Sequence, residues 1–389
     1  MQLWHKASVA TCLALLAWTD LRAGKRQVTE AEVQSVHRSA LLIDTHNDVT
    51  SFTVEGFDIG TTGSKHNTDL ARLKMGGVGA VFFAAYVGPE YAASRTSAVR
   101  ALQMIDTIRT DIVARYPNDF VLAQSAADIE GAPKRGRIAA LIGIEGGHAI
   151  EDSLRLLRDF YALGVRYMTL THTNTNGWAD SSGDIDKPEV KHHNGLSDLG
   201  KRVVAEMNQL GMIVDVSHVS DKTFWDALEI SRAPIFASHS SCRAICSVAR
   251  NMTDEMIVAM AKKGGVIQIN FSSAFLSQRS ADADRLAEAA KSGKDRPQLP
   301  PAALEDAVAH INHVVKIAGI DAVGIGSDFD GIKSVPTGLE DVSKFPNLTR
   351  ALLEEGYSPS DIRKIYGGNT LRLMRAVERA ARELKGSNM

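Results

Sequence analysis

Leu41-Leu42-Ile43-Asp44-Thr45-His46-Asn47-Asp48 is the stretch that decides the fold, because an apolar run of strand type ends here in a histidine and an acid. Along an extended strand, residues two apart point to the same face. His46 and Asp48 therefore project together from the end of the predicted strand. Such a pair can hold a divalent metal such as zinc, or it can form an ordinary hydrogen-bonded pair in a turn. The rest of the chain has to decide between these two interpretations.

The composition is that of a large globular protein. The chain has 389 residues, of which 44% are hydrophobic and 23% charged, and its formal net charge is -2. This is enough apolar material for a sizeable core, and nothing in the charge points to nucleic acid or an anionic membrane surface as a partner. Besides Cys12, the cysteines are Cys242 and Cys246. We expect these two to be buried and unpaired, and we expect no cysteine-based metal site.

The first 23 residues differ in character from the rest. A basic start at His5 and Lys6, an apolar run over 13–18 and the small residue Ala23 resemble a secretory signal peptide. The apolar run is too short to span a membrane comfortably. We therefore expect a signal peptide over 1–23, a single mature domain over 24–389, no transmembrane anchor after processing, and a periplasmic or secreted protein. The alternative is a simple N-terminal tail.

Apolar segments of strand type alternate with amphipathic helical segments along the chain. Near-continuous apolar runs are typical of parallel strands that are buried on both faces. Eight strands are predicted, at about 41–48, 79–87, 138–147, 165–172, 212–218, 234–239, 266–271 and 322–331. Such a series fits an α/β fold of the TIM-type (β/α)8 barrel better than an open doubly wound sheet. We also expect a helical insertion within 272–301, and a break at Gly367-Gly368 in the terminal helices.

Acids and histidines gather where the predicted strands end, and in a TIM-type barrel the active site lies at those ends. The residues concerned are His46, Asp48, Glu145, His172, His218, His239 and Asp328. Taken singly, each can be a cap or a packing residue. Together, at several strand ends, they favour a metal centre. The remaining histidines are expected to pack (His148, His310, His313) or to be solvated (His192, His193).

Five of these residues can hold two metal ions. His46 and Asp48 suit one ion, His218 and His239 suit the other, and Glu145 can bridge them. Two bridged ions lower the pKa of a shared water toward ~7 and polarise a carbonyl.

Two strand-end residues are then left for the chemistry. Asp328 can orient the attacking water and act as general base and then as general acid. His172 can hydrogen-bond the oxyanion.

Taken in order, these motifs resemble the membrane (renal) dipeptidase family of zinc peptidases, from about Val33 to about Arg375. The matching segments are 43–48, 143–147, 170–173, 215–220, 238–241 and 326–331. The resemblance implies an amidohydrolase-type barrel with two zinc ions that hydrolyses the peptide bond of dipeptides by a metal-bridging hydroxide. The family accepts D-residues at the C-terminal position and is often dimeric, so a homodimer is possible.

The resemblance also implies a role for each strand-end residue. His46 and Asp48 match the ligands of the first zinc, Glu145 matches the bridge, and His218 and His239 match the ligands of the second. Asp328 matches the acid/base residue, and His172 matches the group that contacts the scissile carbonyl or oxyanion.

The family also holds the substrate's C-terminal carboxylate with an arginine and a tyrosine. Arg250 falls where that arginine belongs, and a planar guanidinium can bind a carboxylate through two hydrogen bonds. Phe275 stands where the tyrosine is expected, which removes one potential hydrogen bond of order 1 kcal/mol. The side-chain preference of the substrate therefore stays open.

Two alternatives remain. One is a related metal-dependent hydrolase of another amide, a lactone or a β-lactam. The other is a non-catalytic metal-binding protein, against which Asp328 and His172 argue, since neither is needed to hold metal.

Overall fold

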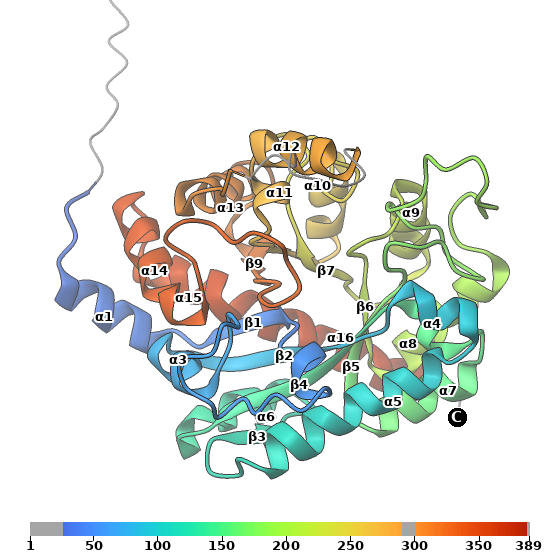
Figure 1. Cartoon of the computed structure of the whole chain (residues 1–389), viewed down its shortest axis with the longest axis horizontal. Helices are drawn as coiled ribbons and strands as arrows, with labels where there is room; N and C mark the ends of the chain where they lie inside the picture. Colours follow the sequence, from blue (N-terminus) through green and yellow to red (C-terminus); the bar gives the residue numbers. More distant parts are fainter. Residues whose placement is uncertain (1–25, 290–299, 387–389) are drawn as a thin grey trace, which may run out of the picture.

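Parallel strands form the sheet at the centre of the molecule (Figure 1). The computed structural model describes residues 26–289 and 300–386, so the predicted signal peptide lies outside the described residues. The strands are β1 (Leu42–Asn47), β2 (Val78–Tyr86), β3 (Phe120–Leu122), β4 (Ile138–Glu145), β5 (Val165–Thr169), β6 (Ile213–Asp215), β7 (Phe236–Ser240), β8 (Val266–Ile269) and β9 (Val323–Ile325). Their order is β1-β2-β4-β5-β6-β7-β8-β9, and β3 pairs only with β4.

The sheet closes on itself where β9 meets β1. Asn47, the last residue of β1, forms a parallel bridge with Phe329, which lies beyond β9. The Asp48 N–H donates to the Phe329 carbonyl at 2.9 Å, and the Asp328 N–H donates to the His46 carbonyl at 3.0 Å. The predicted eight-stranded TIM-type barrel is therefore confirmed.

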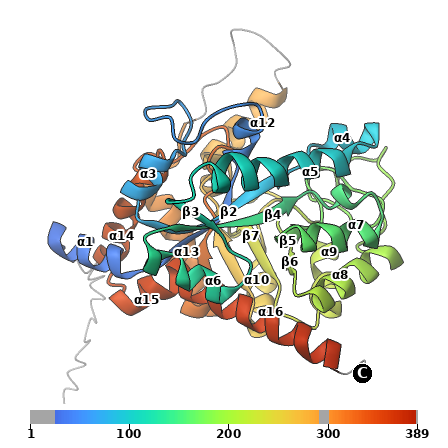
Figure 2. The same ribbon diagram turned by 90° about the horizontal axis from the view of Figure 1, so that it is seen from below.

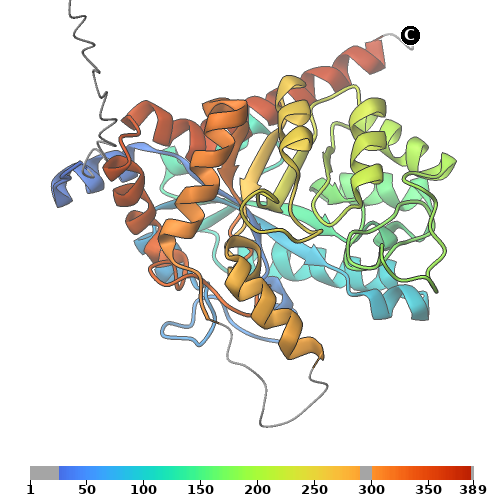
Figure 3. The same ribbon diagram turned by 90° about the horizontal axis from the view of Figure 1, so that it is seen from above.

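Helices surround the strands on the outside (Figures 2 and 3). The α-helices are α1 (Glu30–Ser39), α2 (Thr50–Thr53), α3 (Leu70–Met75), α4 (Pro89–Ser94), α5 (Ser97–Thr107), α6 (Ala126–Gly131), α7 (Leu154–Ala162), α8 (Asp198–Leu210), α9 (Asp221–Ile230), α10 (Asp254–Lys262), α11 (Ser273–Leu276), α12 (Gln278–Ala289), α13 (Leu304–Ala318), α14 (Phe345–Glu354), α15 (Pro359–Arg363) and α16 (Asn369–Gly386). Shorter 3₁₀ turns are η2 (Pro133–Arg135), η3 (Gly147–Ile150), η4 (Ile320–Ala322) and η5 (Val342–Lys344), and π-helical turns are η1 (Ile108–Ala114) and η6 (Lys364–Gly368). Helices α11 and α12 are the helical insertion expected within 272–301.

Local sequence chemistry sets the helix ends. In α8, the Ser197 side chain accepts a hydrogen bond from the Gly200 N–H, and Gly211 ends the helix in the left-handed conformation at φ +89°. Serine satisfies a free N–H at a helix start, and glycine adopts positive φ without a Cβ clash. These two caps fix the helix at Asp198–Leu210.

Two features differ from the predictions. Strand β3 was not predicted, because three residues are too few to show a period. The expected break at Gly367-Gly368 was wrong, because η6 continues the helix from α15 into α16. Gly367 serves close packing instead: a Cβ there would lie 2.2 Å from the Leu41 carbonyl oxygen.

The barrel interior is filled by large side chains. Phe82, Tyr167 and Phe236 are fully buried, and the Tyr167 ring centroid lies 5.2 Å from that of Phe82 and 5.3 Å from that of Phe236. Helix α16 lies across the end where the strands begin, next to α8 and α6 (Figure 2). Cys242 and Cys246 are buried and unpaired, as predicted. Within residues 26–289 and 300–386, no helix combines the length and apolar character that a membrane span needs.

Candidate metal centre

All seven strand-end residues lie together at the carboxyl end of the barrel. Strands β1 and β7 carry His46 and His239, and β4 ends in Glu145. Asp48 directly follows β1, and His172, His218 and Asp328 follow β5, β6 and β9 within three residues. Five of the seven are buried, and His172 and His218 are half-buried. Because the strands are parallel and adjacent, their carboxyl ends meet in one place.

Glu145 lies at the centre of this cluster and points one oxygen to each side. Its Oε2 lies 3.6 Å from His46 Nε2. Its Oε1 lies 3.0 Å from His218 Nε2 and 3.2 Å from His239 Nε2. A carboxylate placed this way can share its two oxygens between two neighbouring ions.

Two ligand atoms in the cluster have no hydrogen-bond partner among the described residues. His46 Nε2 and Asp48 Oδ2 are both buried without one, although they face each other at 3.1 Å. His218 Nε2 faces His239 Nε2 at 3.0 Å. Buried polar atoms without partners cost about 1–3 kcal/mol each, and a cation at either place would satisfy them.

Three groups in the described part of the chain have ligand atoms within 4.8 Å of one another. They are His46 with Asp48 and Glu145, Glu145 with His218 and His239, and His46 with His239 and Asp328. Imidazole nitrogen and carboxylate oxygen are a donor set that suits zinc and similar divalent ions. The residues therefore fit two adjacent metal ions.

The electrostatics favour the ligating protonation states of three groups. Burial alone would raise the pKa of Glu145, but the surrounding histidines outweigh it and hold this pKa well below its ordinary value. Burial, together with the Arg250 charge, lowers the pKa of both His218 and His239 well below the ordinary value. Metal ligands have to be an ionised carboxylate and neutral imidazole.

A second layer of side chains holds the histidine rings, and the sequence analysis missed it. The Tyr167 hydroxyl lies 2.7 Å from His46 Nδ1. The Ser238 hydroxyl lies 2.7 Å from His239 Nδ1 and donates to Asp215 at 2.6 Å. Partners of this kind fix the ring orientation of metal-ligating histidines. Their only sequence signal was position, since all three lie within the last few residues of a strand.

The backbone is strained at the site. His218, Asp328 and Asp330 all adopt left-handed conformations, at φ +67°, +63° and +70°. Such conformations are uncommon outside glycine and asparagine, and they persist where the surroundings hold them. For Asp328 the bond from its N–H to the His46 carbonyl is one such restraint.

A cavity of about 570 Å³ opens in front of the cluster. Its lining includes Tyr86, His172, Ser272, Phe275, Asp328 and Asp330. His172 Nε2 lies 3.7 Å from Glu145 Oε1, and the His172 ring packs edge-on against Tyr86. The acid/base and oxyanion candidates therefore line the same cavity.

Arg250 lies beside Phe275, which lines this cavity. The Arg250 guanidinium carbon lies 5.5 Å from the centroid of the Phe275 ring. Arg250 Nη2 donates to the His239 carbonyl at 2.8 Å, while its buried Nε has no hydrogen-bond partner among the described residues. One edge of the guanidinium is therefore held by the backbone, while its Nε donor is unpaired among the described residues.

The other histidines have structural surroundings. His148 Nε2 lies 3.2 Å from the Gly88 carbonyl, and His313 pairs with Asp254. The expectation that His192 and His193 are solvated was wrong in part. Both are half-buried and lie within hydrogen-bond distance of backbone carbonyls, because the loop that carries them folds back on itself.

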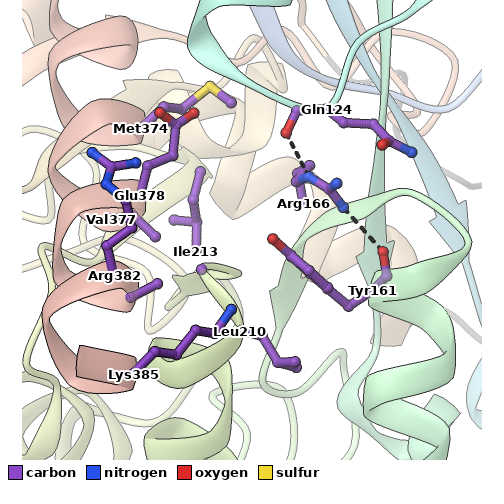
Figure 4. Close-up of a pocket in the computed structure, with 12 residues that line it drawn as sticks. Gln124, Tyr161, Arg166, Leu210, Ile213, Met374, Val377, Glu378, Arg382 and Lys385 are labelled. Atoms are coloured by element: carbon purple, nitrogen blue, oxygen red, sulfur yellow. Dashed lines mark hydrogen bonds between the residues drawn. The ribbon is translucent and has the colours of Figure 1, made fainter. Parts of the chain in front are cut away.

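A smaller hollow lies at the opposite end of the barrel, between α16 and the starts of β5 and β6 (Figure 4). Its central cation, Arg166, donates from Nε to the Gln124 carbonyl at 2.6 Å and from Nη1 to the Tyr161 carbonyl at 3.1 Å. These two N–H groups of Arg166 already donate to backbone carbonyls. None of the metal-type groups of the described residues lies there, so the chemistry belongs to the carboxyl end.

Comparisons with known proteins agree with this site. The family model for membrane dipeptidase (peptidase family M19) matches residues 30–388. An uncharacterized dipeptidase of Schizosaccharomyces pombe is 36% identical over an alignment of 384 residues, which covers 94% of this chain and 87% of that protein. The solved structure of PvdM, a probable dipeptidase of Pseudomonas aeruginosa, is 28% identical with a TM-score of 0.79, over 90% of this chain and 98% of that one.

A further solved structure, a metallopeptidase of Rhodobacter sphaeroides, carries a phosphinate mimic of the dipeptide L-Ala-D-Ala. It is 26% identical with a TM-score of 0.74, over 87% of this chain and 99% of that one. The family match covers the whole barrel and every strand end of the metal centre. The chain belongs to the membrane dipeptidase family, peptidase family M19, and is a metallo-dipeptidase.

Proposed function

We propose that this protein hydrolyses the single peptide bond of free dipeptides with two zinc ions. His46 and Asp48 would hold the first ion, His218 and His239 would hold the second, and Glu145 would be shared between them. The observation that carries the proposal is the placement of Glu145, whose two oxygens face two separate histidine groups at 3.6 Å and 3.0–3.2 Å. The buried, unpaired His46 Nε2 and Asp48 Oδ2 support it.

When bound, the two ions supply a hydroxide near neutral pH and polarise the scissile carbonyl. Asp328 accepts the proton of the attacking water as the carbon–oxygen bond forms. It then delivers that proton to the leaving amine as the carbon–nitrogen bond breaks. Burial and the Asp48 and Glu145 carboxylates raise the pKa of Asp328 well above its ordinary value, which suits a group that must carry a proton.

His172 stabilises the oxyanion that develops on the carbonyl oxygen. Burial lowers its pKa, so the ring is neutral and donates one N–H to the substrate. Arg250 holds the C-terminal carboxylate of the dipeptide beside the Phe275 ring. The Rhodobacter sphaeroides structure with a phosphinate mimic of L-Ala-D-Ala supports a dipeptide substrate, including one with a D-residue at the C-terminal position.

The experiment is to compare the wild-type protein with Asp328→Asn, both loaded with zinc. Free L,L and L,D dipeptides are assayed beside N-acetylated dipeptides and tripeptides, and released amino acid is measured. We expect cleavage of free dipeptides only. We expect the variant to retain two zinc ions per chain and to lose about 10²- to 10⁴-fold in kcat. Wild-type turnover by Asp328→Asn would disprove the mechanism.

We also propose that the protein is exported and acts in the periplasm or outside the cell as a single domain over 24–389. The basic, apolar and small-residue pattern of residues 1–23 supports removal of a signal peptide. N-terminal sequencing of the mature protein tests this, and light scattering in solution tests the homodimer that the family resemblance implies.

A further inference from the structure

Asn270 is a buried amide that reaches the reacting end of the barrel from the strand next to β9. It follows β8 directly, and its side chain is fully buried. Its Nδ2 donates to Asp328 Oδ2 at 2.7 Å. Its Oδ1 accepts a hydrogen bond from the backbone N–H of Ser272.

These two partners define the orientation of the amide. A backbone N–H can only donate, so the Asn270 atom that faces Ser272 has to be the oxygen. The nitrogen therefore faces Asp328, and Asp328 Oδ2 has to act as an acceptor. Because Asp328 Oδ2 accepts this hydrogen bond, it has no proton on the side that faces Asn270.

The other oxygen of Asp328 faces the metal ligands. Oδ1 lies 3.9 Å from His46 Nε2. The main chain of Asp328 is already held in its left-handed conformation by the bond from its N–H to the His46 carbonyl. Only the side-chain torsions are left to move, and the Asn270 bond restrains them.

We propose that Asn270 is a positioning residue, which fixes the Asp328 carboxyl group so that Oδ1 alone carries the proton between the water and the leaving amine. The proton leaves the attacking water for Oδ1 as the carbon–oxygen bond forms. It then passes from Oδ1 to the amine nitrogen as the carbon–nitrogen bond breaks. The inference rests on the proposed acid/base role of Asp328.

Asn270 also ties this acid/base to the wall of the substrate cavity. Ser272, which donates to Asn270, lines the cavity and immediately precedes α11, the helix that contains Phe275. The same side chain therefore holds a catalytic candidate and a piece of the binding surface. Misplacement of a reacting group by about 1 Å can cost about 10²-fold in rate.

The deciding variant is Asn270→Asp, measured in the zinc-loaded full-length protein. Aspartate has the shape of asparagine and still accepts from the Ser272 N–H, but it presents an oxygen to Asp328 where the donor was. We expect kcat to fall about 10- to 100-fold with an unchanged KM and two zinc ions retained. If Asn270 only supported Ser272, this variant would keep its kcat.

Asn270→Ala and Gln268→Ala form a matched pair in case the aspartate variant folds poorly. Gln268 is also a fully buried amide, on β8, and it donates to the Thr370 hydroxyl at 3.0 Å. Both variants are expected to melt at a lower temperature. Only Asn270→Ala is expected to lose kcat, and it should lose as much as Asn270→Asp or more.

A double-mutant cycle separates this inference from the proposed function. In an Asp328→Asn background, the Asn270→Asp change is expected to cause no further loss of kcat, since residues that act as a unit are not additive. Additive losses, loss of zinc from Asn270→Asp, or a wild-type kcat for Asn270→Asp would overturn the positioning role. Wild-type turnover by Asp328→Asn alone would instead overturn the proposed function.

Discussion

Replacement of Tyr167 by phenylalanine is expected to weaken metal binding while it leaves the barrel intact. Tyr167 and His46 are both fully buried, and the hydroxyl lies 2.7 Å from His46 Nδ1. The ring packs against Phe82 and Phe236 and lies over Gly143, where a Cβ would come within 2.0 Å of it. Phenylalanine keeps all of these ring contacts and removes only the hydroxyl.

The size of the effect follows from the burial. Water cannot replace the lost hydroxyl at a site without solvent access, so His46 Nδ1 is left unpaired at a cost of about 1–3 kcal/mol. Since 1.4 kcal/mol is a factor of ten, this corresponds to about 5- to 150-fold in a binding constant. Changes in the partners of metal-ligating histidines commonly cost about 10- to 100-fold. We therefore expect the zinc affinity of the His46 and Asp48 site to fall by about 10- to 100-fold.

The assay is competition for zinc with a coloured chelator at fixed pH. Tyr366→Phe is the matched control, because the Tyr366 hydroxyl is buried and bonds to Thr349 at 2.7 Å, away from the metal centre. It should lower the melting temperature and leave the zinc affinity unchanged. Equal zinc affinities for Tyr167→Phe and Tyr366→Phe would refute the reasoning.

Two further predictions concern substrate binding and the stability of the fold in acid. Phe275→Tyr adds a hydroxyl beside Arg250 that can donate a hydrogen bond to the substrate carboxylate. Such a bond contributes about 0.5–1.5 kcal/mol, so KM for free dipeptides should fall about 2- to 10-fold. Steady-state assays should show no fall in KM for C-terminally amidated dipeptides. An unchanged KM for free dipeptides would contradict the proposal that the substrate carboxylate binds beside Arg250 and residue 275. Burial lowers the pKa of His310 to about 4, while its Nδ1 accepts from the Cys242 N–H at 2.9 Å. The unfolded chain, with a histidine pKa of about 6.5, therefore binds more protons between these values, so stability should fall by about 3 kcal/mol as pH falls from about 6.5 to about 4. Denaturant unfolding of the metal-free protein should show a flatter pH dependence for His310→Asn, and identical slopes would count against this assignment.

Much of the fold and of the site could be predicted from the order of apolar and polar residues within single segments of the chain. Buried parallel strands have near-continuous apolar runs, so a segment such as Val78–Tyr86 is visible without any knowledge of its neighbours. Once the strands are parallel and adjacent, their carboxyl ends have to meet. Residues such as His46, Glu145 and His239, far apart in the chain, could therefore be assigned to one site before any contact between them was known.

Contacts between strands were decided only by the tertiary structure. Tyr167 and His46 are 121 residues apart, and Asn270 and Asp328 are 58 apart. Each pair depends on the register of different strands and on which way a buried side chain turns. The same is true of Gly367, whose role is set by the approach of the Leu41 carbonyl rather than by the helix around it. Residue type and strand position determine which groups reach the site, while packing across the barrel determines which neighbour holds each of them, because no local pattern encodes a partner on another strand.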